Sequence, residues 1–165
     1  MTPDIISIVG KSNSGKTTLM VKLIGELSNR NLRIGSVKHA HDGFEFDHKG
    51  KDSYRHKQAG ASATLVLSNT RAALVRDDDR NDIERMRAYH PDVDLVLAEG
   101  FKRQAIAKIE IFRKDGPHPH PFCLEDPHLI AFVTDSDQAP GHVPVFGLED
   151  IQAIADFIEP RIRQR

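Results

Sequence analysis

The stretch Gly10-Lys11-Ser12-Asn13-Ser14-Gly15-Lys16-Thr17 decides the fold of this chain. It lies between an apolar run at residues 5–9 and a segment whose apolar residues recur at helical spacing from Leu19 to Leu27. The pattern G-x-x-x-x-G-K-T between a strand and a helix is typical of a phosphate loop, whose backbone N–H groups and helix N-terminus face phosphate oxygens. An ordinary glycine and serine turn, the alternative, does not account for this frame. We therefore expect a nucleoside triphosphate as the ligand.

The same pattern assigns roles to individual side chains. Lys16 is expected to reach the β- and γ-phosphates, and Thr17 to ligate Mg²⁺. Because a threonine hydroxyl alone is a weak ligand, the metal needs a carboxylate as well. Glu99, which follows the apolar residues 94–98, is the first candidate, and Asp47, in the polar loop 38–50, is the second. The alternatives are a surface glutamate at a strand end and a solvated loop aspartate.

The rest of the chain predicts an α/β fold of the P-loop NTPase type, with a mostly parallel sheet flanked by helices and an antiparallel hairpin insertion. The alternating residues 107–112 indicate a half-exposed strand, whereas residues 94–98 and 129–133 read as buried strands. We expect a single nucleotide-binding domain over residues 1–165. The other expected elements are helices at 16–29, 51–59, 82–89 and 151–158, strands at 32–37 and 143–146, and a hairpin of 64–67 with 72–75.

Composition narrows the class of protein. The 23 Lys and Arg residues nearly balance the 24 Asp and Glu residues, so net charge gives no support to a nucleic-acid or anionic-membrane partner. The one cysteine cannot form an internal disulfide, and we find neither a signal peptide nor an apolar run long enough to span a membrane. These features favour a cytoplasmic protein.

Several further stretches together resemble one family. They are the loop Val37 to His41, the run Gly50-Lys51-Asp52-Ser53-Tyr54-Arg55-His56, the residues Ala59-Gly60-Ala61, the run Leu97-Ala98-Glu99-Gly100-Phe101-Lys102, and Lys108-Ile109-Glu110. This set is similar to the molybdopterin-guanine dinucleotide biosynthesis adaptor proteins, over nearly the whole chain. The resemblance implies a GTP-binding protein that uses Mg²⁺, hydrolyses GTP slowly, forms a homodimer and assists the transferase that joins GMP to molybdopterin.

Carried onto this sequence, the resemblance also implies site residues. Glu99 takes the metal side, and Asp47 falls in the family's acidic loop. Two departures, His41-Asp42 in place of a histidine pair and Lys49 in place of a proline, leave the role of His41 open. The phosphate-binding set is Gly10, Lys11, Ser12, Asn13, Ser14, Gly15, Lys16, Thr17 and Thr18.

Two residues receive hypotheses of their own. Asp135 follows a late buried strand, and its carboxylate can accept both N1–H and N2–H of guanine, so we hypothesise that it selects the base. Lys11 resembles the extra lysine of the deviant phosphate loop in dimeric ATPases, which acts on the partner subunit's nucleotide. The alternative for Lys11 is a solvated loop lysine.

Two other functions compete with this interpretation. A small-molecule kinase shares the phosphate loop and the sheet, but it needs an arginine-bearing lid, for which only Arg76 to Arg80 is available. The second competing function is an adaptor that does not hydrolyse GTP, in which bound GTP only orders the loop 38–50. Molybdopterin itself is a further possible ligand of the adaptor.

Overall fold

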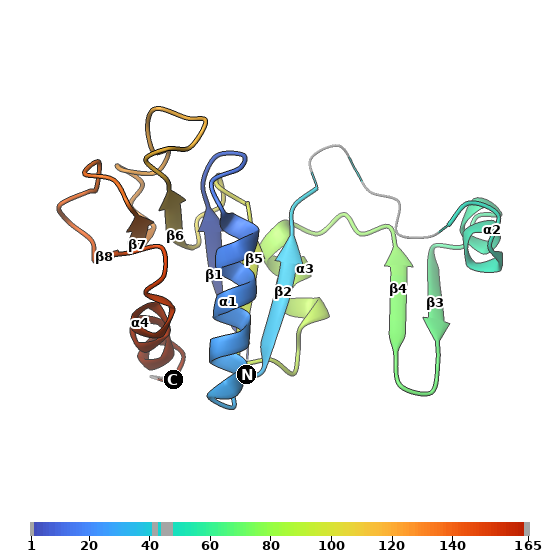
Figure 1. Ribbon diagram of the computed structural model, residues 1–165. Coiled ribbons are helices and arrows are strands. Elements are labelled where there is room, and N and C mark those ends of the chain that lie inside the picture. Colours follow the sequence, from blue (N-terminus) through green and yellow to red (C-terminus); the bar gives the residue numbers. More distant parts are fainter. Residues whose placement is uncertain (1, 41–42, 44–47, 164–165) are drawn as a thin grey trace. The chain divides into compact units, whose positions relative to one another are not determined.

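The computed structural model describes residues 2–40, 43 and 48–163. Figure 1 labels twelve elements along the chain. In order they are β1 (Asp4–Val9), α1 (Lys16–Asn29), β2 (Ile34–Lys38), α2 (Asp52–Gln58), β3 (Ala63–Leu67), β4 (Ala72–Arg76), α3 (Asp82–Tyr89), β5 (Leu95–Glu99), β6 (Ala107–Phe112), β7 (Leu129–Thr134), β8 (Val145–Phe146) and α4 (Ile151–Arg163).

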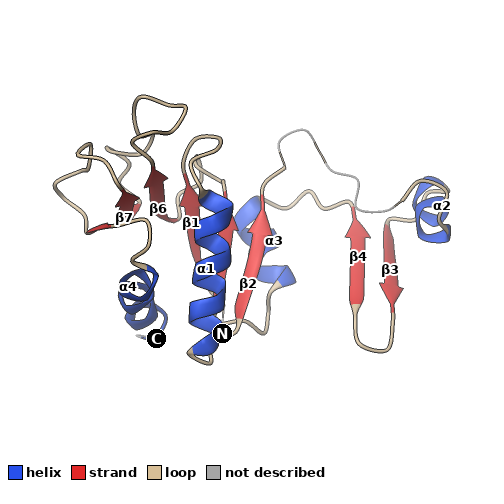
Figure 2. Ribbon diagram, in the orientation of Figure 1, coloured by secondary structure: helices blue, strands red, loops and turns tan. Residues whose placement is uncertain are grey.

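Six strands form one sheet in the order β2-β5-β1-β6-β7-β8, and each paired register is parallel. Figure 2 shows these strands beside α1 and α4. The order places β1 between β5 and β6, so the segments that follow these three strands meet at one edge of the sheet. The predicted α/β class with a mostly parallel sheet is confirmed.

The core on one face of the sheet is built by α1 and α4. Leu23 and Leu27 of α1 and Ile154 and Ile158 of α4 are fully buried in a cluster with side chains of β1, β5, β6 and β7. Arg30, which follows α1, joins the two helices through ion pairs with Asp156 (2.6 Å) and Glu159 (3.1 Å). These contacts fix helix α1 on the sheet, and with it the loop at residues 10–15 that leads into the helix.

The prediction of a half-exposed strand at residues 107–112 is wrong. Strand β6 lies inside the sheet between β1 and β7, and Lys108 and Glu110 are each only 1% exposed. Lys108 is accommodated because its Nζ pairs with Asp126 at 2.9 Å and donates to the Gln104 carbonyl at 2.7 Å. The alternating polar residues of β6 are buried charges that have partners. The periodicity of the sequence is the same for such residues as for a solvent-exposed face of a strand.

The chain divides into two compact units, residues 1–39 with 86–165, and residues 40–85. In the second unit β3 and β4 form a separate antiparallel pair that registers Ala63 with Arg76, which confirms the predicted hairpin. Helix α2 precedes it and buries none of its residues. The expectation of a single domain stays a prediction.

Small shifts in element bounds have local causes. Strand β2 begins at Ile34 rather than at Leu32, since Arg33 forms an ion pair with Asp94 at 2.7 Å just before β5. Asn81 caps α3, its Oδ1 accepting the Glu84 N–H at 3.0 Å. Among the described residues, no helix combines the length and the apolar character that crossing a bilayer requires.

Candidate functional site

The loop between β1 and α1, the predicted phosphate loop, is shaped by residues with left-handed backbone angles. Gly10 (φ 147°), Asn13 (φ 61°) and Gly15 (φ 97°) have positive φ angles. At Gly10 a side chain is also excluded by space, because a Cβ would lie 2.5 Å from the Ile111 carbonyl oxygen. The first turn of α1 has neither a side-chain cap nor an acidic residue. Its N–H groups are thus left for an anion.

Lys16 lies over this loop. Its Nζ donates to the Lys11 carbonyl at 2.7 Å. Burial lowers the pKa of Lys16, Glu99 opposes that shift, and the positive charges of Lys102 and Lys38 add to it. Three lysine charges therefore act on the same place, a field that favours a polyanion.

Thr17 and Glu99 are brought together from different elements. Thr17 Oγ1, in the first turn of α1, donates to Glu99 Oε2 at 2.9 Å at the end of β5. The turn after Glu99 is anchored twice, as Gly100 N–H donates to the Ile8 carbonyl at 3.0 Å and Ser7 Oγ to the Gly100 carbonyl. The two oxygens predicted to share a metal are thus adjacent.

A cavity of about 550 Å³ opens at this place, a volume typical of small-ligand sites. Ser14, which lies in the same loop, has a buried Oγ without a hydrogen-bond partner among the described atoms. Hydroxyl and carboxylate oxygens are the donors that Mg²⁺ prefers, so the residues present fit a magnesium triphosphate. Residues of the cavity wall are Ser12, Asn13, Gly15, Lys16, Thr17, Thr18, Glu99 and Arg113.

Arg113 is a wall residue that sequence reasoning missed. It directly follows β6, the neighbour of β1, so its place at the carboxyl edge became evident only once the strand order was known. Glu110 was missed as well, since its side chain reads as the exposed face of a strand. Its carboxylate accepts the N–H groups of Phe122 (2.5 Å) and Cys123 (2.7 Å).

Other predicted site residues lie elsewhere or outside the description. Asp135 is exposed after β7, and its Oδ1 accepts the Lys114 N–H at 2.7 Å. Lys11 contributes its backbone carbonyl to Lys16, while burial raises the pKa of Glu110 and the Lys11 charge opposes that rise. Asp47 and His41 lie outside the described residues. Within the described residues, no group of three or more His, Cys, Asp or Glu side chains could hold a metal.

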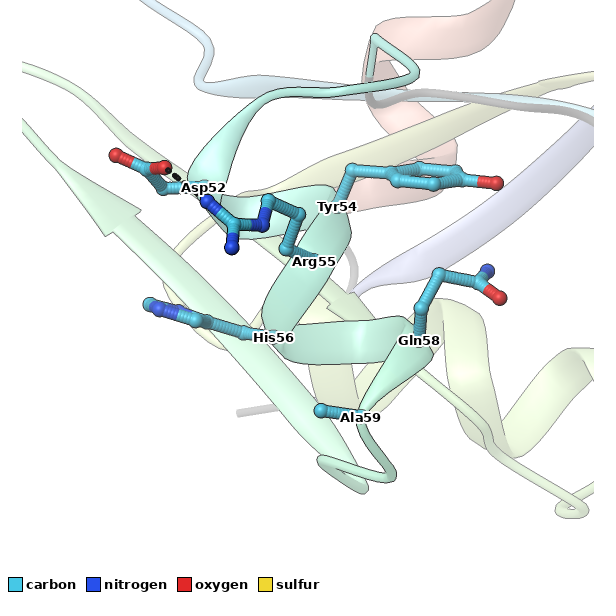
Figure 3. Close-up of a pocket in the computed structure, with 6 residues that line it drawn as sticks. All are labelled: Asp52, Tyr54, Arg55, His56, Gln58 and Ala59. Atoms are coloured by element: carbon cyan, nitrogen blue, oxygen red, sulfur yellow. Dashed lines mark ion pairs between the residues drawn. The ribbon is translucent and has the colours of Figure 1, made fainter.

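The Gly-Lys-Asp-Ser-Tyr-Arg-His run, residues 50–56, leads into α2 and forms its first five residues in the second unit. Figure 3 shows Tyr54 and Gln58 extending to one side of the helix, and Asp52 and His56 to the other. Arg55 is paired with Asp52 at 3.8 Å, an exposed contact that contributes little to stability. These side chains line an open surface pocket rather than a core.

Two proteins of known name are similar to this chain over nearly its whole length. The adapter protein of molybdopterin-guanine dinucleotide biosynthesis from Escherichia coli (strain K12) is 37% identical over 161 residues, which cover 93% of this chain and 90% of that protein. A protein of the same name from Haemophilus influenzae is 36% identical over 94% of this chain and 87% of its own.

Among solved structures, the crystal structure of Bacillus subtilis MobB superposes with a TM-score of 0.77 at 25% identity, over 98% of this chain and 99% of that one. The family profile described as molybdopterin guanine dinucleotide synthesis protein B matches residues 5–135. This chain therefore belongs to the MobB family.

Proposed function

We propose that this protein is a cytoplasmic, GTP-binding adapter of molybdopterin guanine dinucleotide synthesis. It assists the guanylyltransferase that joins GMP to molybdopterin, and it binds GTP with Mg²⁺ and hydrolyses it slowly. Family membership supports the biosynthetic role. The nucleotide role is supported above all by the 2.9 Å contact between Thr17 and Glu99 beside the phosphate loop.

The chemistry at this site follows from the side chains. Lys16 supplies a cation to the phosphate oxygens, and Thr17 and Glu99 would hold Mg²⁺ or its waters. The metal supplies charge neutralisation on the phosphates when it is bound. Arg113 adds a second cation to the wall of the cavity, although it is exposed.

Calorimetric titration with GTP, with and without Mg²⁺, tests this proposal. We expect Lys16→Ala to weaken GTP binding about 10- to 100-fold under both conditions, because a charge-assisted contact to the phosphates is lost. Glu99→Ala should weaken binding only when Mg²⁺ is present. Lys114→Ala, an exposed lysine outside the cavity wall, is the matched control. If Glu99→Ala lost the same GTP affinity in EDTA as in Mg²⁺, Glu99 would not be a metal ligand.

Phosphate release separates the proposal from its competitors. Slow Mg²⁺-dependent release that disappears in Lys16→Ala supports hydrolysis, whereas binding without release supports an adaptor gated by GTP alone. A kinase would instead transfer phosphate to a member of a metabolite panel. The adapter role is tested by adding the protein, with GTP and then with GDP, to a guanylyltransferase assay with molybdopterin.

The proposal includes a homodimer. In the hairpin unit, three leucines are largely exposed: Leu65 (55%), Leu67 (69%) and Leu74 (45%). A two-stranded sheet by itself is only marginally stable in water, and an exposed apolar patch marks an interaction surface. A second copy of the chain would cover it. Sedimentation of wild type and of Leu65→Lys with Leu67→Lys tests this, and a monomeric wild type contradicts it.

Lys11 is tested by complementation. If Lys11 acts on the partner's nucleotide, a heterodimer of Lys11→Ala and Lys16→Ala subunits has one site with both lysines and one with neither, so hydrolysis should partly return. The Lys11 charge acts on Glu110 of its own chain, which favours the other outcome, in which the mixture is no better than its parents.

A further inference from the structure

A second, smaller cavity adjoins the 550 Å³ cavity beside the phosphate loop, which we call the phosphate cavity. The two share Gly15, Thr18 and Arg113. The second cavity adds Lys22 of α1 and the pair Leu148 and Glu149, which stand between β8 and α4. It lacks Lys16, Thr17 and Glu99, the residues that mark the terminal phosphates and the metal, among its described wall residues.

This arrangement gives a bound nucleotide a direction. The terminal phosphates belong beside Lys16 and Glu99, so the nucleoside must leave the loop on the side away from them. Thr18 borders both cavities, and the second cavity begins on that side. The nucleobase would therefore enter the space between α1 and the segment before α4.

The second cavity has a volume of about 90 Å³, so a heterocyclic base would enter it as Lys22 and Glu149 separate, and its walls have the chemistry that such a base needs. Leu19, Ile111 and Leu148 supply apolar surface, and Lys22 and Glu149 stand beside them. Lys22 Nζ donates to Glu149 Oε2 at 2.5 Å, and the two side chains are 38% and 81% exposed. Apolar walls with a few directed polar groups are the usual composition of a small-molecule site.

The segment that carries Glu149 is held in place by its own hydrogen bonds. Gly147 N–H donates to Asp150 Oδ2 at 2.8 Å, and the Ile154 N–H donates to the Asp150 carbonyl at 3.0 Å at the start of α4. The Glu149 carbonyl accepts the Ile151 N–H at 2.8 Å. The backbone is held in place, and the Glu149 carboxylate reaches a ligand by separating from Lys22.

We propose that this second cavity is the nucleobase site and that Glu149 selects guanine, a proposal that rests on the nucleotide binding proposed above. A carboxylate accepts both N1–H and N2–H of guanine, while adenine presents an acceptor at N1. Lys22, released from Glu149, donates to the guanine O6. This assignment replaces Asp135, one of whose oxygens already accepts the Lys114 N–H.

The test measures binding of GTP, ITP and ATP to wild type, Glu149→Gln, Glu149→Asp and Asp135→Asn. Glu149→Gln should reduce the ratio of GTP to ATP affinity by about tenfold or more, because its amide cannot accept both guanine N–H groups. Glu149→Asp keeps the charge but is one methylene shorter, so it should also lower the ratio. Inosine lacks the N2 amine, so ITP should bind wild type more weakly than GTP and lose less than GTP in Glu149→Gln. Circular dichroism of each variant checks that it is folded.

The outcomes separate this inference from the proposed function. Wild type that binds GTP while Glu149→Gln keeps the full GTP preference overturns the assignment and leaves the proposed function intact. A shift in Asp135→Asn alone assigns the base to the end of β7 instead. Wild type that binds GTP and ATP equally excludes a guanine reader, and wild type that binds neither contradicts both proposals.

Discussion

The phosphate loop and the loop at residues 113–125 follow neighbouring strands, β1 and β6, but they are held in place by different means. The phosphate loop uses its own backbone, with glycines at positive φ and the Lys11 carbonyl receiving Lys16 and Ser14. The second loop is attached through Glu110, a carboxylate inside β6 that accepts two of its N–H groups. The first needs only adjacent residues, whereas the second depends on one buried charge twelve residues away from Phe122.

Loss of the Glu110 carboxylate is the largest effect that this comparison predicts. Glu110→Ala leaves the Cys123 and Phe122 N–H groups without their acceptor, and we expect the free energy of unfolding to fall by about 3 kcal/mol. Urea denaturation measures it. Glu99→Ala, at a half-buried carboxylate on the edge of the same sheet, is the control and should change stability little. Equal losses in the two variants would mean that the second loop does not depend on Glu110.

Gly10→Ala tests the phosphate loop in the same way. A methyl group there lies 2.5 Å from the Ile111 carbonyl and 2.6 Å from Ser14 Oγ, and the φ of 147° disfavours it. We expect a loss of about 1–3 kcal/mol in stability and weaker GTP binding. Gly25→Ala, where no atom is close, is the matched control and should be neutral or stabilising. A Gly10→Ala variant with wild-type stability and binding would show that the loop tolerates rearrangement.

The contrast between the two loops also bears on what the sequence predicts. Thr17 and Glu99, which the sequence assigned to one site, lie 2.9 Å apart, and both were found from local patterns, the motif and the end of a buried strand. Lys108 and Glu110 were placed on a solvated face, since their partners Asp126 and Cys123 are distant in the sequence. Arg113 and Glu149 border the cavities only because of the strand order, which no local pattern contains.

Buried Glu110 also makes stability depend on pH. Burial raises its pKa above the ordinary value of 4.5, although the N–H groups of Cys123 and Phe122 and the charge of Lys11 oppose the shift. The folded chain therefore binds this proton more tightly than the unfolded chain, so the group's contribution to stability falls as the pH rises above 4.5. The stability difference between wild type and Glu110→Gln, followed from pH 4.5 upward, should fall. A constant or rising difference would contradict a raised pKa of Glu110 in the folded protein.

The smallest effect concerns the thiol beside Glu110. Burial, with the negative charge of Glu110, raises the pKa of Cys123 to about 12, and its side chain is 2% exposed. We expect iodoacetamide at pH 8 to react with the folded protein far more slowly than with the protein in urea. Glu110→Ala should raise the rate if the 113–125 loop opens. Equal rates in the folded and unfolded wild type would show that the loop does not cover the thiol.

The uncapped first turn of α1 has a consequence for the lifetime of the protein. Its N–H groups have no side-chain cap, so a phosphate could accept hydrogen bonds from them in the folded state. The unfolded chain has no such site, so phosphate binding would stabilise the folded state. At a nucleotide concentration 100 times the dissociation constant, that linkage stabilises the fold by about 2.7 kcal/mol. Under the proposed GTP binding, a cell that depletes its GTP would degrade this protein faster, so its abundance would follow guanine nucleotide supply.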